Sequence, residues 1–281
     1  MMENLGFLAA VGAALAWGSY TVPFKKSQSS NLMQFQALMG VGILLSGILF
    51  SLILGYPLTL NIYGLVSGVL WAVANAISLI ALSNLGLSRA VPLMGSIVML
   101  GSFLWGTLVF KEISTNLTGG LIGIGLLIIG VVLVSSTTKA FSQNIKKGTA
   151  AAILAALIWG SQLAPLKIGH LTPRDFFFPS CLGIFITAVL IVLVSKLKFK
   201  KEATVESLLS GAIWNVGNLL SIIAISMIGL AKGQPISLSS SLVGVLWGLF
   251  YFKEVTQIKK RLQILIGTIV LITGVIVLGL A

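Results

Sequence analysis

The chain has 281 residues and a net charge of +12; 57% of its residues are hydrophobic, only 9% are charged, and the mean hydropathy is +1.08. Soluble domains are about a quarter charged, so this composition excludes a soluble domain and indicates an integral membrane protein. The surplus of Lys and Arg falls mainly in loops, which is typical of membrane topology and argues against a nucleic-acid partner.

Apolar stretches long enough to cross a bilayer, which takes about 20 residues each, follow one another along the chain. We place ten spans at 5–24, 32–54, 61–82, 88–110, 117–138, 148–167, 176–195, 207–229, 233–252 and 262–280. The expected fold class is an all-α integral membrane protein. We expect a first five-helix repeat over 1–140, a polar linker over 141–147 and a second five-helix repeat over 148–281.

A repeat at an offset of 142 or 143 residues relates the two halves. All six tryptophans fall into repeated motifs: Trp17-Gly-Ser and Trp159-Gly-Ser, Trp71 with Asn75 and Trp214 with Asn218, Trp105-Gly and Trp247-Gly. Likewise Gly86-Leu-Ser-Arg89-Ala-Val-Pro92 recurs as Gly229-Leu-Ala-Lys232-Gly-Gln-Pro235. Each half has an odd number of spans, so the second half must enter the membrane from the opposite side. This predicts an inverted repeat, an architecture that many secondary transporters use.

The basic residues predict the orientation of these spans. With both termini on one side, the loops of the other side carry 14 Lys and Arg residues, and the terminal side carries 4. Because Lys and Arg concentrate in cytoplasmic loops, we expect both termini to face outward.

No enzyme signature is visible in the sequence. It shows no phosphate-binding loop, no metal cluster and no set of nucleophile, histidine and acid, so we expect no enzyme and no cofactor. All six acidic residues lie near span ends or in loops, which removes the usual proton relay of a coupled transporter. The repeated pairs Lys111-Glu112 and Lys253-Glu254 indicate ion pairs that fix loop geometry.

Neutral polar residues occupy the middle of spans 3 and 8. Asn75 and Asn218 lie there, and Trp71 and Trp214 precede them by four residues on the same helical face. An indole packs on the C–H face of a sugar while an amide bonds its hydroxyls, so these pairs are candidate substrate contacts. The alternative is that each Asn joins neighbouring helices.

Further candidates come from other spans. Trp17 and Trp159 are expected to line a cavity, and Gln36 and Ser239 add an amide and a hydroxyl. Arg89 and Lys232 are either gates at the cavity mouths or anchors that extend to the interface. The glycine-rich spans 5 and 10 are expected to pack helices, and they are a candidate homodimer face.

These residues together resemble the drug/metabolite transporter superfamily, within it the sugar-uptake branch with the glucose/ribose porter and the L-rhamnose–proton symporter. The motifs that carry the resemblance are Pro23-Phe-Lys-Lys26, Trp71 with Asn75, the turn 86–92, and Trp105-Gly with Phe110-Lys-Glu112. The resemblance implies ten helices as five plus five inverted, a cavity formed by spans 1–4 and 6–9, and a carbohydrate substrate.

The first hypothesis is therefore a secondary transporter that moves a monosaccharide across the cytoplasmic membrane by alternating access, with the bilayer and a small solute as its partners. Without an acid in midspan, uniport is simpler than proton symport. An exporter of amino acids or other metabolites is the alternative. A membrane scaffold without transport is a remote third hypothesis.

Overall fold

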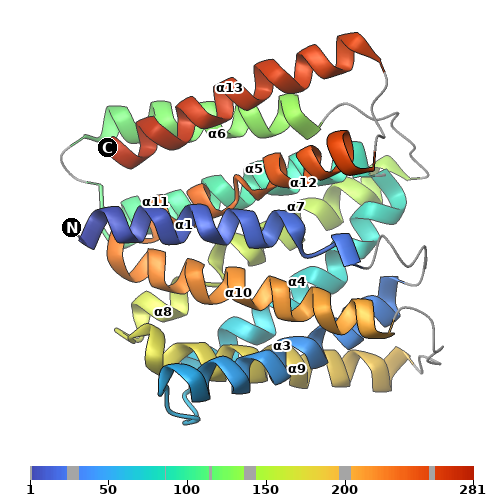
Figure 1. The fold of residues 1–281 in the computed structure, drawn as a ribbon, viewed down its shortest axis with the longest axis vertical. Helices are drawn as coiled ribbons and strands as arrows, with labels where there is room; N and C mark the ends of the chain where they lie inside the picture. Colours follow the sequence, from blue (N-terminus) through green and yellow to red (C-terminus); the bar gives the residue numbers. More distant parts are fainter. Residues whose placement is uncertain are drawn as a thin grey trace.

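A computed structural model describes residues 2–23, 32–85, 87–113, 116–135, 144–195, 204–252 and 257–281. Every regular element within these residues is a helix (Figure 1). The first half contains α1 (Met2–Ser19), α3 (Leu32–Leu54), α4 (Ile62–Leu85), α5 (Leu87–Leu104), the π-helical turn η1 (Trp105–Val109) and α6 (Leu117–Ser135). The second half contains α7 (Ile145–Ser161), α8 (Ala164–Ile168), α9 (Pro173–Ser195), α10 (Thr204–Ile228), α11 (Leu230–Ser237), α12 (Ser240–Leu246), the π-helical turn η2 (Trp247–Tyr251) and α13 (Ile258–Leu280).

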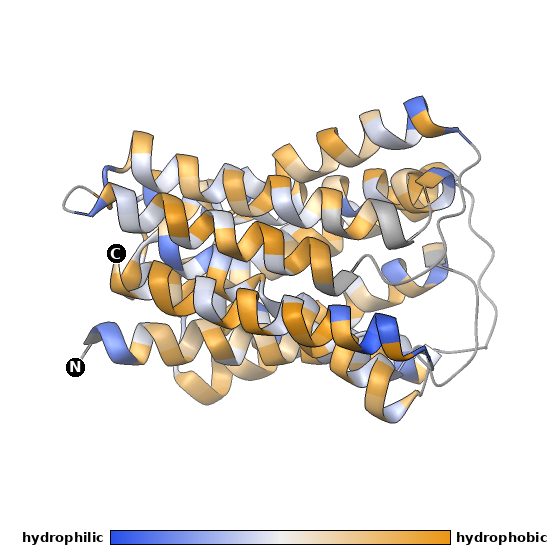
Figure 2. Ribbon diagram, turned by 90° about the horizontal axis from the view of Figure 1, so that it is seen from above, coloured by the Kyte–Doolittle hydropathy of each residue, from blue (hydrophilic) through white to orange (hydrophobic). Residues whose placement is uncertain are grey.

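The helices carry the apolar surface of a membrane protein. Within the described residues, six helical segments are long and apolar enough to cross a bilayer: Met33–Leu54, Ile62–Leu85, Ile145–Ile168, Pro173–Ser195, Thr204–Ile228 and Ile258–Leu280. Leu, Ile and Val side chains are exposed along most helices. Figure 2 shows the apolar colour along the lengths of the helices and the polar colour mainly near their ends. The protein is therefore a multi-pass helical membrane protein.

Helices occupy each stretch that the sequence predicts as a span, but some of these stretches are divided into shorter helices. The stretch 148–167 divides into α7 and α8, and the stretch 233–252 divides into α11, α12 and η2. Pro165 stands in the first turn of α8, where its missing N–H costs nothing. Helix α7 begins at Ile145, inside the predicted linker, because the Asn144 side chain accepts a hydrogen bond from the Lys147 backbone N–H.

The two halves interlock helix by helix. Helix α1 packs on α10 as its repeat equivalent α7 packs on α4, and α3 packs on α10 as α9 packs on α4. The equivalent helices α3 and α9 also pack on each other, as do α6 and α13. In Figure 1 α6 and α13 lie together at one edge, and both chain termini lie at the same end of the bundle. Most of the packing thus joins one half to the other.

Glycines set the closest of these helix contacts. A Cβ on Gly42 of α3 would collide with the Leu208 backbone oxygen of α10, and a Cβ on Gly211 of α10 would collide with that of Met39. The equivalent contacts between α4 and α9 are those of Gly68 with the Ser180 oxygen and of Gly183 with the Leu65 oxygen. Small residues let membrane helices approach closely enough for dense backbone packing.

The glycines of spans 5 and 10 are used within the chain. Gly123 and Gly130 of α6 face Leu278 and Leu271 of α13, and Gly274 faces Leu127. The glycine faces of these two helices are therefore covered by each other. The homodimer through spans 5 and 10 stays a prediction that would have to use their outer, leucine- and isoleucine-rich faces.

The Gly68 contact can be tested with a single methyl group. We expect Gly68→Ala to lower the free energy of unfolding by about 1–3 kcal/mol, since the added carbon overpacks the α4–α9 interface. The measurement is thermal unfolding of the detergent-solubilised protein. Gly125→Ala is the matched control, because no neighbouring helix or side chain comes within 4 Å of the place that its added methyl group would occupy. Equal stability of the two variants would contradict close packing at Gly68.

Candidate functional site

Three tryptophans from three helices form the aromatic centre of the protein. Trp71 of α4 and Trp214 of α10 have ring centroids 4.3 Å apart with a tilt of 49°, and Trp17 of α1 stacks on Trp214 at 6.1 Å. All three are buried, with exposed fractions of 5–9%. Trp159 of α7 packs against the same cluster. Four of the sequence-predicted site residues are thus brought together from both halves.

The contact between Trp71 and Trp214 is a contact between repeat equivalents. The indole N–H of Trp17 donates to the backbone oxygen of Trp214 at 3.1 Å, which fixes α1 against α10 at this level. Residues related by the repeat therefore meet each other where the two halves join. In this conformation the two indoles, one from α4 and one from α10, are in direct contact.

The two predicted asparagines differ in their surroundings. Asn218 is buried and its amide donates to Oδ1 of Asn215 at 3.4 Å. Asn215 in turn donates to Ile43 O and to Ser46 Oγ of α3, so this network joins α10 to α3. Asn75 is half-buried, and its side-chain amide makes no hydrogen bond with any described residue. Asn75 is thus the one of the pair whose side-chain amide is wholly unbonded within the described residues.

A second pair of repeat equivalents uses tryptophan as a hydrogen-bond donor. Trp105 Nε1 donates to Ser161 Oγ at 2.9 Å, and Trp247 Nε1 donates to Ser19 Oγ at 2.8 Å. Each of these tryptophans begins a π-helical turn. The backbone N–H five residues later, that of Phe110 or Phe252, donates to Trp105 O or Trp247 O. Such turns are rare and often mark functional sites. The repeat therefore extends to local backbone geometry.

The remaining candidates are spread over the bundle. Gln36 is buried and donates to Ala72 O at 3.4 Å, and Ser239 is half-buried at the turn between α11 and α12. Lys232 lines a cavity of about 290 Å³ with Glu3, Asn4 and α13 at the end of the bundle where the chain termini lie. The side chain of Arg89 lies outside the described residues.

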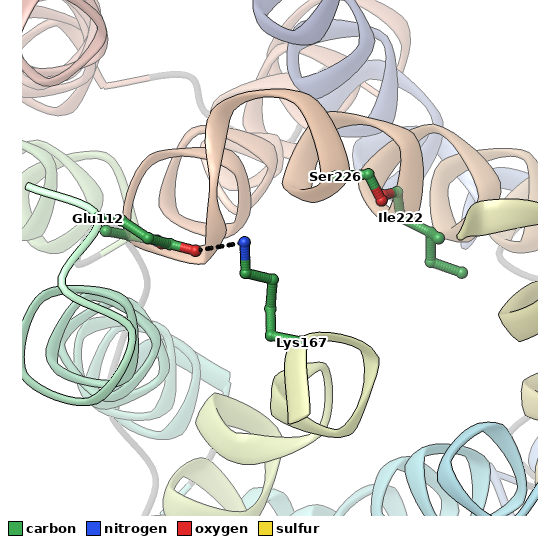
Figure 3. Close-up of polar contacts among 5 residues, drawn as sticks. Glu112, Lys167, Ile222 and Ser226 are labelled. Atoms are coloured by element: carbon green, nitrogen blue, oxygen red, sulfur yellow. Dashed lines mark hydrogen bonds and ion pairs between the residues drawn. The ribbon is translucent and has the colours of Figure 1, made fainter. Parts of the chain in front are cut away.

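Glu112 forms a charged contact between three elements, which the sequence did not predict. Its Oε1 lies 2.9 Å from Nζ of Lys167 on α8, and its Oε2 accepts a hydrogen bond of 2.8 Å from the Ala231 backbone N–H in the first turn of α11. Figure 3 shows the Lys167 side chain extending from α8 toward the Glu112 carboxylate. The partner of Glu112 is thus Lys167 and not the neighbouring Lys111. We call this contact the terminal-end latch, because it lies at the end that carries both termini.

Two glycines make room for the latch. Gly229 has φ of +83°, a backbone conformation that glycine adopts readily, and a side chain there would press on the Glu112 carboxylate. Gly106 of η1 faces the same carboxylate and Ala231. The first turn of α11 and the Lys167 side chain therefore hold the two oxygens of the Glu112 carboxyl group from different sides.

The latch predicts a stability effect at Glu112. We expect Glu112→Ala to lower the free energy of unfolding by about 1.5–3 kcal/mol, because a charge-assisted hydrogen bond is lost and Lys167 is left without its partner. Thermal unfolding in detergent measures the loss. Glu206→Ala in the first turn of α10 is the control and should cost less than about 1 kcal/mol, the size of a helix-dipole contribution. A loss at Glu112 no larger than that at Glu206 would refute the latch.

Sequence reasoning missed Glu112, Asn215 and Gln234. Asn215 and Gln234 have no polar repeat equivalents, since Ala72 and Val91 stand in their places, so the search for repeated polar pairs passed over them. The role of Glu112 was missed because its partners lie 55 and 119 residues away in the chain, whereas the sequence suggested the adjacent Lys111.

Comparison with known proteins identifies the class. The family model described as "Sugar transport protein" matches residues 8–281, so the chain belongs to the sugar transport protein family. A protein named "Glucose uptake protein GlcU" from Bacillus subtilis is 25% identical over 99% of both chains. A "Putative sugar uptake protein" from Bacillus anthracis is 25% identical over 98% of this chain and 99% of its own length, and a "Probable glucose uptake protein GlcU" from Staphylococcus aureus is 28% identical over 99% of both.

One solved structure shares the fold. A chain described only as "Crystal structure of protein" superposes with a TM-score of 0.73 at 17% identity, covering 97% of this chain and 95% of its own length. Because the family and the named relatives are transport proteins, this protein is a transport protein and not an enzyme.

Proposed function

We propose that this protein is a monosaccharide uniporter of the cytoplasmic membrane, built from ten spans as two inverted five-helix halves and working by alternating access. The observation that carries the proposal is the contact between the repeat equivalents Trp71 and Trp214 at the junction of the halves. A site at such a junction is reached from either side when one half rocks against the other.

The helix packing supports the inverted arrangement. Exchanging the two halves maps the α1–α10 contact onto α7–α4, and it maps the Trp105–Ser161 bond onto the Trp247–Ser19 bond. A pseudo-two-fold axis between the halves superposes each half on the other, and it therefore produces such pairs of equivalent contacts. The excess of Lys and Arg at the opposite end favours an outward position for both termini.

The aromatic centre suits a sugar. Indole faces provide large apolar surfaces with a polar N–H edge, and sugar rings combine C–H faces with hydroxyls. Trp17, Trp71, Trp159 and Trp214 would supply the faces, and the unpaired amide of Asn75 would bond a hydroxyl.

The terminal-end latch gives alternating access a physical barrier at one end. It joins the segment after η1, α8 and the start of α11, and opening that end requires its bonds to break. The sequence repeats its charged pair as Lys25 and Glu254, which lie outside the described residues.

Ligand-dependent stability tests the substrate class. We expect an aldose, with D-glucose as the first probe, to raise the free energy of unfolding by about 1.4 kcal/mol at ten times its Kd, since it binds the native state alone. Polyols, nucleosides and amino acids complete the panel. Proteoliposomes loaded with the same sugar should exchange it for labelled sugar without a proton or sodium gradient. Stabilisation by amino acids and by no sugar would overturn the proposal in favour of the exporter.

Asn75 gives a test of the site itself. We expect Asn75→Ala to reduce labelled-sugar exchange at least tenfold with little change in unfolding temperature, because its amide bonds no described residue. Asn84→Ala on the same helix is the control, since Asn84 bonds Ile80 O near the end of α4. Exchange at the wild-type rate in Asn75→Ala would remove Asn75 from the site.

A further inference from the structure

Two polar groups with fixed geometry are buried beside the aromatic centre without partners. The indole Nε1 of Trp159 on α7 and the amide Oε1 of Gln234 on α11 are both buried and make no hydrogen bond to the described residues. Gln234 as a whole is 1% exposed. Its other amide atom, Nε2, donates to the backbone oxygen of Trp159 at 3.3 Å, so the two residues are already in contact.

These two groups differ from the other buried polar atoms that lack a partner. Several of those are hydroxyls of Ser and Thr in helices, which can rotate onto a carbonyl of the preceding turn. An indole N–H cannot rotate in this way, and the Gln234 amide is held by its bond to Trp159. Their unpaired state is therefore a property of the packed structure, and a buried amide oxygen or indole N–H without a partner carries a desolvation penalty.

Their position connects them with the proposed site. Trp159 packs against the cluster that contains Trp17, Trp71 and Trp214, and Gln234 lies one turn before the break between α11 and α12. One group comes from α7 and the other from α11, both in the second half. Broken helices near the middle of transporters form substrate sites because they place polar groups there.

Gln234 also breaks the repeat. Its equivalent in the first half is Val91, whereas the tryptophans and serines of the scaffold occur twice. If the two halves exchange conformations during transport, each half must be able to make the contacts that the other half made before, so the residues of these contacts must occur in both halves. A sugar has no such symmetry, so a residue that distinguishes its hydroxyls is needed only once.

We propose that Gln234 and Trp159 form a polar subsite that receives one hydroxyl-bearing edge of the transported sugar; this rests on the proposed function. The Trp159 indole N–H donates to a hydroxyl oxygen, and the Gln234 Oε1 accepts from a hydroxyl hydrogen. A hydroxyl group offers both capacities at once, which an apolar or purely cationic solute does not. The subsite thereby decides which positions of the sugar must carry a hydroxyl.

Monodeoxy analogues of D-glucose test the subsite. Ligand-dependent thermal stabilisation of the wild-type protein should show at least one analogue that binds about tenfold more weakly than D-glucose, the effect of one lost hydrogen bond. In Gln234→Met, D-glucose itself should weaken about tenfold, and its advantage over that analogue should disappear. Trp159→Phe, which removes the N–H and keeps an aromatic ring, should give the same loss of discrimination.

The ligand-free stability separates this role from a structural one. Gln234→Met removes a buried amide with an unpaired oxygen, and Trp159 O keeps its bond from Gln162 N, so the unfolding temperature without sugar should stay equal or rise. Gln263→Met is the matched control on α13, where the amide bonds Leu133 O, and it should leave sugar binding unchanged.

The outcomes are distinguishable. Wild-type stabilisation by D-glucose together with unchanged binding and discrimination in Gln234→Met and Trp159→Phe would overturn the subsite alone, as would a fall in ligand-free stability with no change in discrimination. A wild-type protein that responds to no sugar would overturn the proposed function, and the subsite with it.

Discussion

The close approach of helix backbones from opposite halves is the constraint on which the rest of the structure depends. Within a bilayer, lipid tails are as apolar as leucine, so helices associate through dense packing and internal hydrogen bonds rather than by excluding water. Gly42, Gly68, Gly183 and Gly211 permit that packing between α3 and α10 and between α4 and α9. Trp71 of α4 and Trp214 of α10 contact each other in the core that these four helices share.

Polar groups then determine what the packed bundle can do. Some join helices, as Asn215 does with Ser46, and others hold the ends of helices, as Glu112 does at α11. A third kind, Trp159 Nε1 and Gln234 Oε1, is buried and makes no bond within the described residues. In a low-dielectric interior each unpaired group is unfavourable, which is why a set of them next to the tryptophans indicates a place for a polar solute.

Much of the fold could be predicted from the sequence because hydropathy and the repeat are one-dimensional signals. Span lengths located the helices, and the tryptophan repeat selected Trp17, Trp71, Trp159 and Trp214, which the structure places in or against one cluster. The break at Leu238 was not predictable, since it depends on how α11 packs against its neighbours. Nor could hydropathy tell that Asn218 bonds Asn215 while Asn75 stays unpaired, because that depends on which face of α10 meets α3 and which face of α4 meets α9.

Residues that occur in both halves and residues that occur in one half only have different roles in the chain. Residues that occur twice, such as Trp105 with Ser161 and Trp247 with Ser19, make contacts that survive an exchange of the two halves. A movement that exchanges the conformations of the halves therefore needs no new scaffold contacts. Gln234 and Asn215, which occur once, would be in different surroundings after such an exchange. Any selectivity that depends on them resides in the second half, so the scaffold can remain symmetric while the site recognises an asymmetric solute.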